Sequence, residues 1–143
     1  MEKIVLASHG SLATGMKSAL KMIACDVDNI QAYDLDSYDS PEQIRNILSK
    51  EISNNNEDSY IIITDLLGGS VHIHLLELCQ YENVVMISGM NLGLVLEIYL
   101  TQSDNLIEKI EHALSSSKSA MKLFTKERIN QYLETDKEVL TDD

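Results

Sequence analysis

The feature that most constrains this chain is a regular alternation of short apolar runs with amphipathic stretches. The apolar runs occupy residues 3–8, 30–35, 60–64 and 84–87. Those at 3–8 and 60–64 are β-branched and apolar on both faces, which is typical of interior strands of a parallel sheet. Apolar residues recur at helical spacing in residues 12–24, 40–52, 71–79, 92–100 and 103–114.

This order of elements predicts a fold class. Strands joined by helical crossovers lie parallel and are connected with a right-handed sense. We therefore predict a doubly wound α/β domain, with a mostly parallel four-stranded sheet in the order 2-1-3-4 and helices on both faces. Ser40, Pro41 and Gln43 mark the start of the second helix as a capping box with proline at the first position. Ser11 could cap the first helix in a similar way.

The end of the chain fits two structures. Residues 120–124, Ala-Met-Lys-Leu-Phe, could form a fifth, antiparallel edge strand or part of a helix. Residues 125–143 are polar and acidic, and we expect them to be partly helical or frayed. We therefore divide the chain into a domain at 1–124 and a C-terminal extension at 125–143.

The charge balance argues against some classes of partner. The chain carries 11 Lys and Arg against 23 Asp and Glu, a net charge of −12. Nucleic acids and anionic membrane surfaces attract basic proteins, so we expect neither as a partner. The apolar runs are all shorter than the roughly 18 residues of a membrane span, and Met1 leads directly into the first strand without room for a signal peptide. We therefore expect a cytoplasmic protein.

The cysteines and two of the histidines do not suggest a metal site. Cys25 and Cys79 fall in the apolar pattern without a Cys-x-x-Cys spacing, and we expect both to be buried, reduced thiols. His72 and His74 look like a metal-binding pair, but residues two apart on a helix point to different faces. We expect a surface position for His72, although it could line a crevice, and no metal.

Polar and small residues gather after three of the predicted strands. His9 and Gly10 follow the first strand, Asp65 and the run Gly68-Gly69-Ser70 follow the third, and Gly89-Met90-Asn91 follow the fourth. In the order 2-1-3-4, strands one and three are neighbours. His9 and Asp65 should therefore face each other at the carboxyl edge of the sheet, where ligands bind in open α/β folds.

This combination suits chemistry at an imidazole ring. A carboxylate bonded to one ring nitrogen fixes the tautomer and raises the nucleophilicity of the other, and Asp65 could do this for His9. The Gly68-Gly69 turn allows close backbone approach, and with the Ser70 hydroxyl it could hold an anion. Phosphoryl transfer onto histidine needs such a site. Each residue alone could also be an ordinary cap or turn residue, so only the combination points to function.

Three segments together resemble the mannose-type enzyme IIA of the bacterial sugar phosphotransferase system. They are Ile4-Val5-Leu6-Ala7-Ser8-His9-Gly10, Thr64-Asp65-Leu66-Leu67-Gly68-Gly69-Ser70 and Ser88-Gly89-Met90-Asn91-Leu92, and their order and separations fit the family. The likeness runs from Met1 to about Phe124. The family usually has proline after Gly-Gly-Ser and often proline after the third segment, where this chain has Val71 and Gly93.

The resemblance implies a site and a set of partners. His9 would be the phosphorylated histidine, with Asp65 bonded to its Nδ1 and Nε2 left to take the phosphoryl group. The phosphate would be held by Gly10, Gly68, Gly69 and Ser70. The donor would be phospho-HPr and the acceptor a histidine of a IIB subunit, with sugar entering through membrane IIC and IID subunits. Family members are homodimers that exchange a C-terminal edge strand, here residues 120–124. We expect no cofactor.

Other functions stay open at this point. A related use of the fold is a phosphate relay for dihydroxyacetone phosphorylation, and another is a regulatory phosphohistidine domain. A third possibility is a flavodoxin-like module whose glycine turn binds a small anion without covalent chemistry. The absence of a Gly-x-Gly-x-x-Gly motif or a phosphate-binding loop leaves nucleotide binding without its usual support.

Overall fold

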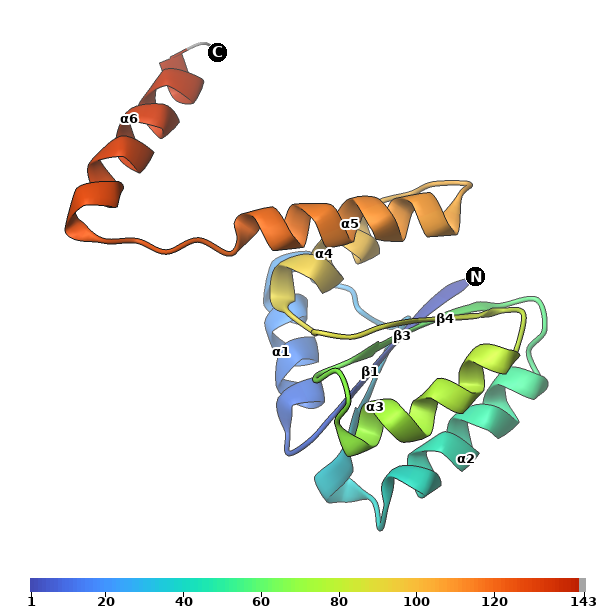
Figure 1. The fold of residues 1–143 in the computed structure, drawn as a ribbon. Coiled ribbons are helices and arrows are strands. Elements are labelled where there is room, and N and C mark those ends of the chain that lie inside the picture. Colours follow the sequence, from blue (N-terminus) through green and yellow to red (C-terminus); the bar gives the residue numbers. More distant parts are fainter. Residues whose placement is uncertain (142–143) are drawn as a thin grey trace.

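The four apolar runs form the strands of one sheet in a computed structural model that describes residues 1–141. The strands are β1 (Glu2–Ser8), β2 (Ile30–Asp34), β3 (Ser59–Thr64) and β4 (Val84–Ile87). The α-helices are α1 (Leu12–Ala24), α2 (Pro41–Ser53), α3 (Ser70–Leu75), α4 (Leu92–Leu100), α5 (Leu106–Ala120) and α6 (Lys126–Thr141) (Figure 1). Two 3₁₀ helices are η1 (Leu35–Ser37) and η2 (Leu76–Gln80).

The sheet has the predicted topology. All its strands are parallel, in the order β2-β1-β3-β4. The central strands β1 and β3 are buried over residues 4–8 and 60–64, which explains their continuous apolar character. Ala7 of β1 lies opposite Thr64 of β3. The chain therefore leaves both central strands at the same edge of the sheet, side by side.

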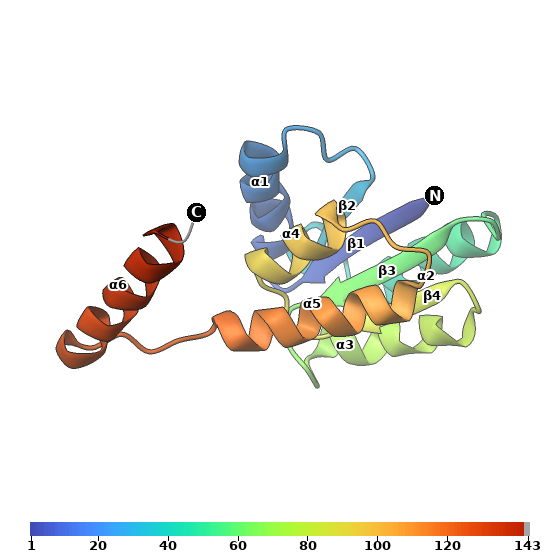
Figure 2. The same ribbon diagram turned by 90° about the horizontal axis from the view of Figure 1, so that it is seen from above.

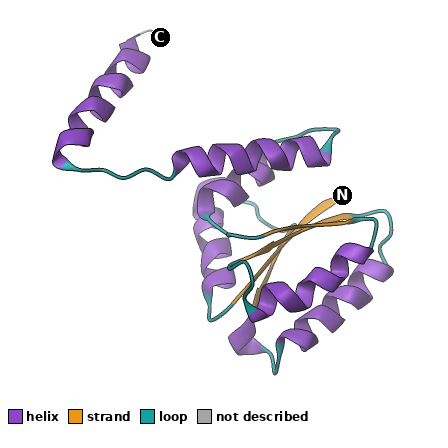
Figure 3. Ribbon diagram, viewed as in Figure 1, coloured by secondary structure: helices purple, strands orange, loops and turns teal. Residues whose placement is uncertain are grey.

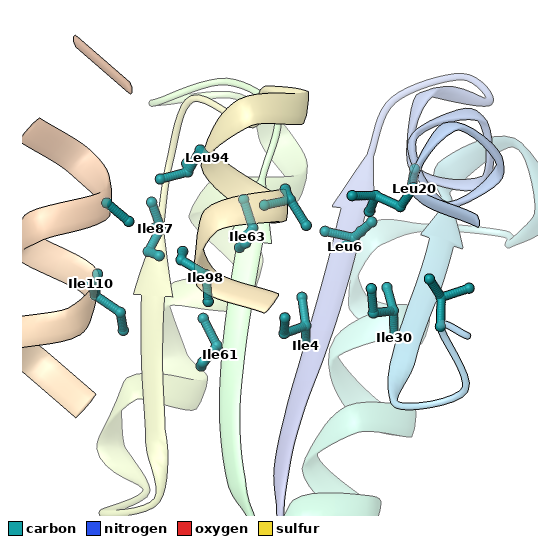
Figure 4. Close-up of a cluster of buried hydrophobic side chains, with 14 residues drawn as sticks. Ile4, Leu6, Leu20, Ile30, Ile61, Ile63, Ile87, Leu94, Ile98 and Ile110 are labelled. Atoms are coloured by element: carbon teal, nitrogen blue, oxygen red, sulfur yellow. The ribbon is translucent and has the colours of Figure 1, made fainter. Parts of the chain in front are cut away.

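Two apolar clusters hold helices against the two faces of the sheet. Because side chains alternate along a strand, neighbouring residues of β1 and β3 contribute to different clusters. One cluster contains Ile4, Leu6, Leu20, Ile63, Ile98 and Ile110 (Figure 4). The other contains Val5, Leu48, Ile62 and Leu75. Helices α1, α4 and α5 cover one face, and α2 and α3 cover the other (Figures 1 and 2).

The start of α2 agrees with the sequence signals. The Ser40 hydroxyl accepts the Gln43 backbone N–H at 3.3 Å, and Pro41 occupies the first helical position. The Gln43 side-chain oxygen in turn accepts the Asp39 N–H at 2.7 Å. The Ser40 bond satisfies an N–H group that a helix start leaves without an internal partner, and the Gln43 bond holds the residue before the cap.

The start of α1 is held by the sheet instead of by Ser11. Ser11 makes no side-chain cap bond. The Ser8 hydroxyl, at the end of β1, accepts the Ala13 N–H at 2.7 Å. The Asp34 carboxylate, at the end of β2, accepts the Thr14 N–H at 3.0 Å and also bonds the Thr14 hydroxyl. These bonds tie the first turn of α1 to the ends of β1 and β2.

The prediction of two buried cysteines is wrong. Both Cys25 and Cys79 are exposed. Cys25 follows the end of α1, and its left-handed backbone (φ +66°) takes it off the helical pattern. Cys79 lies in η2, where the tighter 3₁₀ helix replaces the predicted continuation of α3 and shifts the residues from the α-helical period.

The C-terminal segment leaves the sheet. Residues 121–125 form neither helix nor strand between α5 and α6, so no fifth strand forms within the described part of this single chain (Figure 3). Met121, Leu123 and Phe124 are exposed. The Phe124 ring meets Tyr132 of α6 edge-on, with centroids 5.0 Å apart. Figure 2 shows α6 away from the sheet. Among residues 1–141, no helix combines the length and apolar composition that a membrane crossing requires.

The two serines before α1 should differ in their effect on stability. Ser8→Ala removes the acceptor of a buried N–H, so we expect it to lower the free energy of unfolding by about 1–2 kcal/mol. Ser11→Ala removes no cap and should change that free energy by less than about 0.5 kcal/mol. Urea titration of both variants measures the difference. Equal losses would show that the Ser8 bond does not support the helix start.

Candidate functional site

The site forms where β1 and β3 end next to each other. His9 follows β1 and Asp65 follows β3. The His9 ring nitrogen Nδ1 lies 2.9 Å from Asp65 Oδ2, and the His9 backbone N–H donates to the same oxygen, also at 2.9 Å. The expected juxtaposition of the two side chains is therefore present, and it follows directly from the parallel pairing of the two strands.

The environment of Asp65 determines which ring nitrogen carries the proton. Burial by itself raises the pKa of Asp65, but the hydrogen bonds from the His9 backbone and ring, together with the charge of His9, outweigh it and hold this pKa below its ordinary value. An ionised carboxylate can only accept hydrogen bonds. The proton between the two side chains therefore belongs to His9 Nδ1, and in the neutral ring the lone pair is then on Nε2.

Ser70 lies on the other side of the ring. Its Oγ is 3.2 Å from His9 Nε2, and because that nitrogen has a lone pair, the serine hydroxyl is the donor. Ser70 is the first residue of α3, so the helix start brings a hydroxyl to the reactive edge of the imidazole.

Position 69 leaves little room for a side chain beside the ring. A Cβ atom there would lie 3.1 Å from His9 Cε1 and 3.2 Å from the Leu66 carbonyl oxygen. The Gly69 N–H donates to that same oxygen at 3.0 Å, which closes the turn. Gly68 (φ +80°) and Gly10 (φ +54°) adopt left-handed backbone conformations on either side of the site, with open space where a side chain would be.

The ring is open to the outside, whereas its partner is not. The His9 side chain is 45% exposed and that of Asp65 only 11%. Leu66 and Leu67, in the turn beside the ring, are exposed too. The imidazole is therefore open to solvent, while the carboxylate below it is largely shielded from water.

The prediction of a surface position for His72 is wrong. His72 is 6% exposed, and its Nδ1 lies 2.6 Å from the Thr64 hydroxyl oxygen. The first turn of α3 packs directly on β3, which turns residues 71, 72 and 75 inward. His74 instead bonds the Ser70 carbonyl oxygen at 2.6 Å and Glu42 at 3.0 Å. The described residues hold no cluster of three or more potential metal ligands.

The segment after β4, Gly89-Met90-Asn91, supports the site but contributes no side chain to it. The Met90 N–H donates to the Thr64 carbonyl oxygen at 3.0 Å. The Asn91 side chain accepts the Leu94 N–H at 3.0 Å and caps α4.

The sequence pattern did not single out Ser8 and Asp34, which hold the loop that carries His9. Their position at the ends of β1 and β2, just before a helix start, is the signal that could have identified them.

Comparisons with known proteins agree with this fold. A family model described as EIIA-man, the PTS system fructose IIA component, matches residues 3–114. The structure of a putative phosphoenolpyruvate-dependent sugar phosphotransferase system permease from Klebsiella pneumoniae is 24% identical, with a TM-score of 0.78 over 85% of this chain and 90% of that one. A phosphotransferase system EIIA component from Streptococcus agalactiae is also 24% identical, with a TM-score of 0.77 over 87% and 98%.

A third structure is the mannose/sorbose specific IIA subunit from Enterococcus faecalis, 20% identical with a TM-score of 0.71 over 87% of this chain and 95% of that one. At such identities the structures establish a common fold. A search of curated protein sequences gave no match. The family model itself spans more than half of the chain. The chain therefore belongs to the EIIA-man family, the mannose- and fructose-type IIA components of the sugar phosphotransferase system.

Proposed function

We propose that this chain is a phosphocarrier that accepts a phosphoryl group from phospho-HPr on His9 and passes it to a histidine of a IIB subunit. Sugar would then be phosphorylated as it enters through membrane IIC and IID subunits. Family membership supports the reaction class. The observation that carries the assignment of the residue is an exposed imidazole whose Nδ1 is bonded to a largely shielded carboxylate at the ends of the two central strands, so that Nε2 is free to react.

The transfer step balances with groups already in the site. The lone pair of His9 Nε2 attacks the phosphorus of the donor, a new phosphorus–nitrogen bond forms, and the donor's phosphorus–nitrogen bond breaks with its electron pair kept by the donor nitrogen. The His9 ring becomes positively charged. Its Nδ1–H, held 2.9 Å from Asp65 Oδ2, lets the carboxylate stabilise that charge. Transfer to the IIB histidine runs through the same step in reverse.

The residues around the ring have separate roles in this proposal. Ser70 donates to Nε2 before the reaction, so its hydroxyl must turn away when that nitrogen attacks, and a phosphoryl oxygen is then within its reach. The Gly69 N–H already donates to Leu66, so Gly69 provides space rather than a hydrogen bond. Gly10 and Gly68 keep backbone without side chains beside the incoming phosphate.

We also propose that the chain is a homodimer in which residues 120–124 pair with a partner's sheet. Met121, Leu123 and Phe124 are exposed apolar residues on an extended segment. β4 is an edge strand with one unpaired side. In this proposal the domain at 1–124 ends with the exchanged segment, and α6 belongs to the extension at 125–143.

The phosphorylation site has a direct test. Incubation with labelled phosphoenolpyruvate, enzyme I and HPr should place acid-labile phosphate on the wild-type chain and none on His9→Gln, because the variant lacks the proposed acceptor nitrogen. His112→Gln, which removes a histidine from the exposed side of α5, serves as the matched control and should be labelled fully. Label on His9→Gln would contradict the assignment. An unlabelled wild-type chain that still binds phosphate would instead indicate a non-covalent anion site.

A second test concerns the space beside the ring. Gly69→Ala should slow phosphorylation by about tenfold or more, since its methyl group would displace the imidazole from its position over Asp65. Gly15→Ala, in α1 with open space around it, should leave the rate unchanged and raise stability by about 0.5–1 kcal/mol. Rates from rapid quenching and urea midpoints separate the two effects. An unaltered rate for Gly69→Ala would show that the close contact between position 69 and the His9 ring does not affect phosphoryl transfer.

The dimer proposal predicts a difference between two truncations. Deleting residues 126–143 should leave a dimer, because the exchanged segment remains. Deleting 121–143 should yield a monomer or a strongly weakened dimer. Light scattering coupled to gel filtration, over a hundredfold range of concentration, measures the molar mass of each. A dimer that survives the longer truncation would contradict the strand exchange.

A further inference from the structure

We propose that His72 is a positioning residue for the phosphoryl-transfer site, an inference that rests on the proposed function. His72 lies in the first turn of α3, two residues after Ser70, and is almost fully buried. Its Nδ1 is 2.6 Å from the hydroxyl of Thr64, the last residue of β3 and the neighbour of Asp65. One side chain thus joins the element that carries Ser70 to the strand that carries Asp65.

One direction of this bond also satisfies the other neighbour of Thr64. The Thr64 hydroxyl lies 3.4 Å from the Ile87 carbonyl oxygen, which can only accept. When the hydroxyl proton is directed to Ile87, His72 carries its proton on Nδ1 and donates to Thr64 Oγ1. The Thr64 carbonyl oxygen also accepts the Met90 N–H at 3.0 Å. His72 is thereby bonded to a residue that the sheet holds through both its side chain and its backbone.

Such an anchor matters because the turn before α3 has little packing of its own. Leu66 and Leu67 are 60% and 73% exposed, and Gly68 adds a flexible backbone position. The turn closes on itself through the Gly69 N–H and the Leu66 carbonyl oxygen. The position of Ser70 relative to the His9 ring is therefore set from the α3 side, where His72 is buried and bonded to Thr64.

The buried hydrogen bond between His72 and Thr64 constrains the first turn of α3, because it joins a residue of that turn to the end of β3.

The first experiment measures phosphoryl transfer at saturating phospho-HPr. His72→Phe keeps the size of the ring but loses the bond, and we expect the maximal rate to fall about tenfold while the KM for phospho-HPr changes less than about twofold. Thr64→Val, which has nearly the same shape as the wild type, should give the same loss. The double variant should lose no more than either single variant, since both remove one interaction. His72→Asn, whose amide can still donate, should recover most of the rate.

Val71→Ala provides the matched control. It weakens the packing of the same turn but leaves the His72–Thr64 bond in place. We expect it to lower stability at least as much as His72→Phe and to change the maximal rate less than about twofold. A wild-type rate for His72→Phe, multiplicative losses in the double variant, or an equal rate loss in Val71→Ala would each overturn the proposal.

A measurement that needs no phosphoryl transfer separates this inference from the proposed function. Nitrogen-15 NMR reports the hydrogen bond that His9 Nε2 accepts from Ser70. In His72→Phe and Thr64→Val, this resonance should move from its wild-type value toward that of Ser70→Ala. An unchanged resonance would refute the positioning role. If it moves although the wild-type chain takes up no phosphate from phospho-HPr, the proposed function fails and the positioning of Ser70 by His72 stands.

Discussion

One oxygen of the Asp65 carboxylate bonds both the backbone and the ring of His9, and the geometry of the site depends on these two bonds. Asp65 Oδ2 accepts both the His9 backbone N–H and its Nδ1–H. The first bond fixes where the loop after β1 lies, and the second fixes how the ring is turned and protonated. Both depend on the pairing of β1 with β3, because only adjacent parallel strands bring these two strand ends together.

The remainder of the fold keeps that arrangement rigid. The two central strands are buried on both faces, so their ends cannot shift without disturbing two apolar clusters. Ser8 and Asp34 tie the first turn of α1 to the sheet, and His72 ties that of α3. The reactive edge of the ring is thus surrounded by loops that are short and bonded to strands, although the ring itself is exposed.

The sequence was sufficient for the sheet and for the meeting of His9 with Asp65. Continuous apolar runs have few alternatives to central parallel strands, and strand order then determines which loops are neighbours. The inward position of His72 could not be read in the same way, because α3 is short and its packing on β3 replaces a regular helical period. Residues 120–124 were ambiguous for a different reason: in the proposed dimer they would pair with a second chain, which a pattern within one chain does not describe.

The openness of His9 has a consequence for how long a phosphorylated form would survive. Because the His9 side chain is 45% exposed, solvent as well as a partner protein would reach a phosphoryl group on Nε2. Loss to hydrolysis would be limited by what surrounds the group. The Asp65 carboxylate bonded to the ring faces Nδ1 and is shielded, so it is poorly placed to deprotonate a water molecule on the Nε2 side. The same orientation that activates the imidazole would thereby spare its product from wasteful turnover.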